Sequence, residues 1–77
     1  MALITDAATA WSAPIVLAED EVWQARKGAV FVTTTVSPDA EDGVALTENT
    51  AIQLSAGRTV RYRKIAATEA VIVREVV

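Results

Sequence analysis

Residues 52–64 read IQLSAGRTVRYRK, and this stretch decides the fold class. Ile52 and Leu54 alternate with polar residues before the SAG step, and Val60 and Tyr62 alternate with arginines after it. A period of two residues is typical of a half-buried strand, and small residues between two such runs are typical of a turn. The stretch therefore predicts a β-hairpin with one apolar face and one cationic face.

The rest of the chain continues this pattern of short strands and turns. Further runs rich in β-branched or aromatic residues, which favour strands, lie at residues 15–17, 22–26, 29–36, 44–46 and 70–77. Residues 71–73 are apolar on both faces, as expected for a strand inside a sandwich or under a neighbouring protein. Six or seven short strands at this spacing indicate an all-β domain, a small jelly-roll-like sandwich or barrel.

Domain organisation follows from the same reading. Residues 13–77 are predicted to form the single β domain, and residues 1–12, which lack sustained alternation, are predicted to form an N-terminal arm. Trp11 lies where the arm meets the domain and is either a core residue or an interface anchor, since aromatic residues are enriched at interface centres. Trp23 lies within a predicted strand and is expected in the core.

The composition restricts the function classes. A chain of 77 residues has a small core of its own, and the absence of Cys and His removes disulfides, the usual zinc sites and the familiar Ser-His or Cys-His catalytic groups. An apolar content of 52% favours burial against other copies. We therefore expect a homo-oligomer that is not an enzyme and needs no cofactor or metal. No apolar run approaches a membrane span and no secretory signal begins the chain, so a soluble protein made in the cytoplasm is expected.

The charge is distributed unevenly along the chain. Residues 1–57 carry eight acidic and two basic side chains, a net charge of −6, whereas residues 58–77 carry five basic and two acidic ones, a net charge of +3. The acidic groups at 19–21 and 39–42 are expected to be solvated turns, because both lie in predicted loops of a domain too small to enclose a sugar or peptide substrate. The second group also lacks the residue order of a calcium loop.

The basic strand can contact either phosphates or an acidic protein surface. Arginines two positions apart on a strand lie about 6.6 to 7 Å apart, similar to the spacing of phosphates. Binders of single strands also need aromatic platforms beside the cations, and the only nearby aromatic residue, Tyr62, faces the opposite way by parity. We therefore predict a protein interface, with nucleic acid disfavoured; its residues are Trp11, Arg58, Arg61, Arg63 and Lys64.

From residue 22 onward the chain resembles a known class of proteins. The landmarks are VWQARKGAVFV, DGVAL, IQLSAGRTVRYR and AVIVREV, in that order. This order is similar to small virion accessory proteins of tailed bacteriophages and gene transfer agents, of the head-decoration (cement) or spike-base type. The resemblance implies a structural virion protein that forms trimers or pentamers and binds a major capsid protein or another virion protein.

A second resemblance covers residues 51–63 alone. The segment AIQLSAGRTVRYR is similar to the second conserved segment of cupins, in which a His normally follows the AG turn as a metal ligand. This chain has no His there, so the resemblance implies at most a metal-free, cupin-like binding module. The alternatives kept beside the virion protein are this module and, after it, a nucleic-acid-binding β domain.

Overall fold

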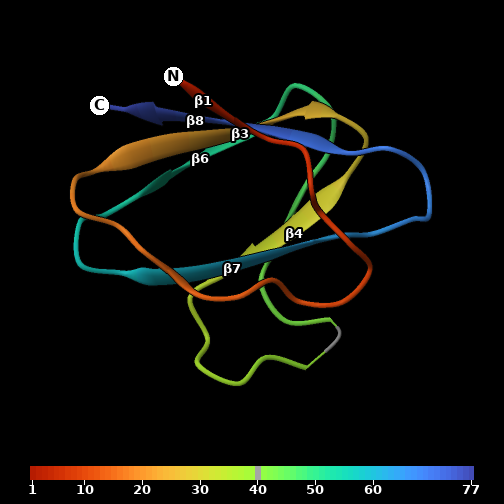
Figure 1. Ribbon diagram of the computed structural model, residues 1–77, viewed down its shortest axis with the longest axis horizontal. Coiled ribbons are helices and arrows are strands. Elements are labelled where there is room, and N and C mark those ends of the chain that lie inside the picture. The colour runs from red at the N-terminus through yellow and green to blue at the C-terminus, as the bar shows by residue number, and fades with distance from the viewer. Residues whose placement is uncertain (40) are drawn as a thin grey trace.

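The computed structural model describes residues 1–39 and 41–77, and these residues form an all-β domain. Its eight strands are β1 (Ala2–Ile4), β2 (Ile15–Val16), β3 (Glu21–Lys27), β4 (Val30–Thr33), β5 (Val44–Leu46), β6 (Ala51–Leu54), β7 (Thr59–Lys64) and β8 (Val71–Val76). They form two four-stranded antiparallel sheets packed face to face (Figure 1). We call the sheet with the order β1-β8-β3-β6 sheet A, and the sheet with the order β2-β7-β4-β5 sheet B.

The strand pairs show a jelly roll. The first strand pairs with the last, β2 pairs with β7, β3 with β6, and β4 with β5. The chain is thus folded in half and rolled into two sheets, the eight-strand arrangement of jelly-roll domains. The all-β jelly-roll-like sandwich expected from the sequence is confirmed, with eight strands within the described residues in place of six or seven.

The hairpin predicted for residues 52–64 is wrong. Strand β6 lies in sheet A and β7 lies in sheet B, so the turn between them crosses from one sheet to the other. Gly57 has a φ of 85°, a conformation that glycine adopts without strain, and its N–H donates to the Leu17 carbonyl over 2.8 Å. The alternation of apolar residues was read correctly, but each strand turns its apolar side toward the other sheet.

The core lies between the sheets. Trp23 is fully buried, as predicted, and its ring lies 6.1 Å from the ring of Tyr62 on the opposite sheet. Around this pair lie buried aliphatic residues from both sheets, including Leu17, Leu54, Val60 and Ile72. Tyr62 therefore faces inward, as its parity predicted.

Strand β4 is shorter than the run 29–36 that predicted it. It ends at Thr33, and Val36, expected on the same face as Val30, is 79% exposed. The Thr35 N–H donates to the Thr33 hydroxyl oxygen over 3.1 Å, which occupies a backbone donor that a strand would use in its ladder. The loop expected at 37–43 follows, and its residue Ala40 lies outside the described residues.

The segment predicted as an arm, residues 1–12, packs on its own domain. Strand β1 pairs with β8 at the edge of sheet A, and Ile4 is buried. Further along, the Ser12 N–H donates to the Tyr62 carbonyl and the Lys64 N–H donates to the Ala8 carbonyl. The accessible surface of the described chain is 4463 Å², close to the roughly 4,500 Å² of a compact monomer of this mass. No part of this segment extends away from the domain.

Candidate functional site

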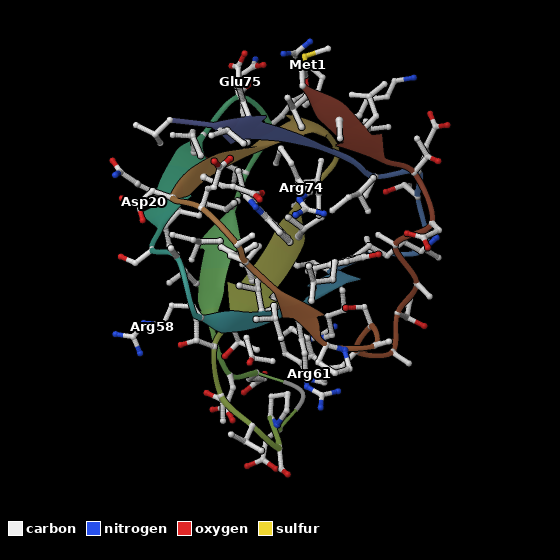
Figure 2. All side chains as sticks on the ribbon, turned by 60° about the vertical axis from the view of Figure 1, so that its left-hand side comes forward. Met1, Asp20, Arg58, Arg61, Arg74 and Glu75 are labelled. Atoms are coloured by element: carbon white, nitrogen blue, oxygen red, sulfur yellow. The ribbon has the colours of Figure 1, made fainter. Side chains whose placement is uncertain are left out.

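Two of the predicted interface residues, Arg61 and Arg63, lie on the outer face of sheet B. They point away from the core because they alternate with the buried Val60 and Tyr62. Arg61 points outward at the bottom of the view in Figure 2. Both arginines are only half-exposed, however, because other parts of the same chain lie over them.

Trp11 is the main cover of this cationic strand. The guanidinium carbon of Arg63 lies 5.4 Å from the centre of the Trp11 ring and 4.6 Å from that of Phe31, so the cation contacts two aromatic rings. The Trp11 indole N–H donates to the Asp39 carbonyl over 2.9 Å, and Arg61 Nη1 donates to the Ser12 carbonyl over 3.3 Å. Trp11 is thus a surface clasp that is half-buried against its own domain.

The other two predicted interface residues lie elsewhere. Arg58 is exposed at the turn between the sheets and points outward at the left of the view in Figure 2. Lys64 is the register partner of Val30, whose side chain is buried, and so shares the face opposite to Arg63. The structure therefore gathers Trp11, Arg61 and Arg63 but does not bring Arg58 or Lys64 into the same patch.

A buried polar cluster on sheet A was missed by sequence reasoning. Glu21, expected in a solvated acidic turn, begins β3 and is 8% exposed. Arg74 Nε and Nη2 donate to its two carboxylate oxygens over 2.9 and 3.0 Å, and the Trp23 indole N–H donates to Oε1 over 3.0 Å. Arg74 bonding and the Trp23 donor hold the pKa of Glu21 below its ordinary value of 4.5, although burial opposes them.

A second polar pair closes the space between the sheets. The Tyr62 hydroxyl donates to Asp6 Oδ1 over 2.7 Å. Burial, and next the hydrogen bond to Asp6, raise the pKa of Tyr62 to about 12. The phenol is therefore a neutral donor that fastens residue 6 of the N-terminal segment onto sheet B.

Two shallow pockets open at the margins of the sandwich. One of about 270 Å³ lies beside Glu21 and Arg74 and is closed by Met1, Ala2 and Val76. The other, of about 300 Å³, is lined mainly by Val32, Val44, Ile52, Leu54 and the threonines at 33–35. Among the described residues, no three His, Cys, Asp or Glu side chains are grouped as a metal site would require. The charged pair at the first pocket, Glu21 with Arg74, is already joined by its own hydrogen bonds.

The outer face of sheet A has a different character. Register partners share a face, so Leu3, Val73, Gln24 and Ala51 form one row across the sheet, and Glu75, Val22 and Gln53 form the next. We call this surface, which also includes Val71, the A face. Val73 is 5% exposed but stands outside the main core cluster, whereas Leu3 is 56% exposed.

Neighbouring residues of β8 point to opposite sides of sheet A. Figure 2 shows Glu75 pointing away from the domain while the adjacent Arg74 points between the sheets. The signal for this face was present in residues 71–73, which are apolar on both sides of the strand. The sequence prediction placed the interface on sheet B instead, because β7 carries several charged residues.

Comparison with protein-family models, with curated proteins and with solved structures finds no match to this chain. Within the described part of the chain, no helix is long and apolar enough to cross a membrane. Arguments about function therefore rest on the surfaces described above.

Proposed function

We propose that the protein is a structural assembly subunit, and specifically a virion accessory protein that decorates or stabilises a phage capsid. The observation that carries the proposal is the A face, where Leu3 is 56% exposed and Val22 and Val71 are only partly buried. Such a surface is characteristic of protein-binding sites. The jelly roll is compatible with this role but does not by itself assign it, since one fold hosts many functions.

The mechanism is burial of apolar surface with electrostatic control of register. Leu3, Val22 and Val71 would leave water on docking, and each square ångström of apolar surface removed contributes about 25 cal/mol before the entropy of association is subtracted. Charged groups at the rim select the orientation more than they add affinity. Many copies of the protein would act by occupying defined positions on a particle, and no chemical step would be involved.

The cupin-like and nucleic-acid alternatives have less support. The centre of the sandwich, where a cupin-like module would hold a ligand, is filled by Trp23 and Tyr62. The arginines that would meet phosphates are engaged, Arg63 with two aromatic rings and Arg61 with the Ser12 carbonyl. A cupin-like module would need the Trp23–Tyr62 packing to be broken, and a nucleic-acid binder would need the two arginines to leave their present contacts.

The test is to look for the protein on particles. Phage-like particles purified from the source should contain this chain by mass spectrometry, and the purified protein should co-sediment with particles from which it has been stripped. Leu3→Glu should reduce co-sedimentation, while the control Val36→Glu, at an exposed loop residue remote from the A face, should not. Absence of the chain from every purified particle would overturn the proposal.

A further inference from the structure

Charge is arranged asymmetrically on the A face. Its centre is uncharged, because Leu3, Val73 and Gln24 occupy the middle row. Glu75 stands at one end of this face, and it is exposed. Arg26 stands near the other end, in the bulge of β3 that follows Ala25.

The basic end carries one cation that is not neutralised by an ion pair in the described structure. Lys27 is paired with Glu69 over 2.9 Å, so these two charges offset each other. Arg26 is exposed and donates only to the neutral Gln24 side-chain oxygen, over 3.3 to 3.4 Å. One negative and one positive end therefore flank an apolar centre.

We propose that the A face binds the A face of a second copy of the same chain. The second copy is turned end for end about a twofold axis that lies in the plane between the two faces and runs perpendicular to the strands. This orientation places Glu75 of each copy near Arg26 of the other. An axis parallel to the strands would instead bring the two Glu75 carboxylates together. Of the two face-to-face arrangements, only the first matches opposite charges, and it also brings Leu3 and Val73 onto their own counterparts at the axis.

The size of the face sets the strength of this association. The width of the face is that of four strands about 4.8 Å apart, and its length is that of six residues at about 3.3 Å each. The footprint is therefore roughly 400 Å². A standard interface buries roughly 800 Å² per partner. The pair is therefore weak in dilute solution and forms readily where many copies are held close together, as on a particle.

This inference deepens the oligomeric part of the proposed function and rests on it, but its test needs no particle. Sedimentation equilibrium of the purified chain over a wide concentration range should show a reversible monomer–dimer equilibrium. Arg26→Glu alone and Glu75→Arg alone should each raise the dissociation constant roughly tenfold, because each turns two attractive pairs into two repulsive ones. The double variant should return to the wild-type value.

The control is Arg58→Glu, which makes the same change in net charge as Arg26→Glu at an exposed site away from the A face. It should leave the equilibrium unchanged. Circular dichroism of each variant would establish that the fold is retained. The proposal is overturned if the double variant stays as weak as the single ones, if Arg58→Glu weakens association equally, or if the wild type is a trimer, a pentamer or a monomer throughout. Failure here with the chain still present on particles would remove the pairing mode and keep the proposed function.

Discussion

The two outer faces of the sandwich have opposite character. The outer face of sheet B carries Arg61 and Arg63, and the chain covers them itself with Trp11 and the Ser12 carbonyl. The A face carries Leu3, which is 56% exposed, beside Val73, which is buried. The charged face that stands out in the sequence is thus held by contacts within the chain itself. A charged strand indicates a need for contacts, but the structure shows whether the chain supplies them itself.

The arginines of the two sheets differ in the same way. Arg74 points inward and has a bidentate carboxylate partner, with side-chain exposures of 25% for Arg74 and 10% for Glu21. Arg63 points outward and its charge lies over aromatic rings that remain half-exposed. Removing either cation should therefore have very different consequences.

The largest expected effect is that of Arg74→Ala. It leaves the Glu21 carboxylate buried without its main partner and should lower the free energy of unfolding by about 3–5 kcal/mol. Arg63→Ala, the matched change on sheet B, should cost only about 1 kcal/mol because cation–π contacts at partly exposed sites are weak. Urea unfolding followed by tryptophan fluorescence measures both.

A second variant keeps this test decisive, because Arg74→Ala removes a large part of the stability of so small a domain. Replacing the pair together, Glu21→Leu with Arg74→Met, removes both charges and should be much less damaging than Arg74→Ala, since no unpaired charge stays buried. A double variant as unstable as the single one would mean that the side chains matter for their shape and not for their charge.

The second prediction concerns the cover of sheet B. Trp11→Ala removes the hydrogen bond to Asp39 and the ring over Arg63, and should cost about 1–2 kcal/mol. Limited proteolysis should then cut the segment around residues 8–12 faster. Trp11→Phe keeps a ring and loses only the N–H donor, so its free energy of unfolding should lie between those of the wild type and Trp11→Ala. Equal stability of all three proteins would show that Trp11 does not clasp the domain.

The face each side chain occupies could be predicted from the sequence, but the partner of each strand could not. The alternation around Tyr62 correctly placed the tyrosine inside and both neighbouring arginines outside. The same alternation fits a hairpin and a turn that crosses between sheets, because a small-residue turn with positive φ at Gly57 serves either. Pairing depends on contacts between residues distant in the chain, such as Ala2 with Arg74.

The candidate site was harder to predict for the same reason. Glu21 belongs to an acidic run that is typical of a solvated turn, and its partner is 53 residues away in sequence. Trp11 was expected either in the core or as an interface anchor, and these alternatives did not include a clasp on the surface of its own domain. Only the apolar residues on both faces of 71–73 indicated the A face.

A third prediction distinguishes the inner ion pair of sheet A from an exposed one. The pKa of Glu21 is lowered in the folded state, so the pair contributes stability above the ordinary value of 4.5, and this contribution is lost as the pH falls through the folded-state pKa. Glu21→Gln should flatten this acid dependence of the unfolding free energy. Glu69→Gln, which removes the exposed pair with Lys27, should change it far less, since exposed pairs are screened by water. An equal flattening by both variants would contradict the distinction.

The smallest expected effect is on the titration of Tyr62, which lies on the inner side of the strand whose outer side carries Arg61 and Arg63. It is the only tyrosine of the chain, so the ultraviolet absorbance of tyrosinate reports on it alone. In the folded protein its pKa should lie well above the ordinary 10, at about 12, whereas in concentrated urea it should return toward 10. The raised pKa means that this group stabilises the fold at pH values below 10, and that its contribution is lost as the pH rises through about 12. Asp6→Asn removes the negative acceptor and should move the folded-state pKa part of the way back, because burial of the phenol remains. Glu75→Gln, on the A face, should leave the titration unchanged. A folded-state titration at the ordinary pKa would mean that water reaches the phenol, and that the N-terminal segment does not close this side of the sandwich as the 2.7 Å bond to Asp6 requires.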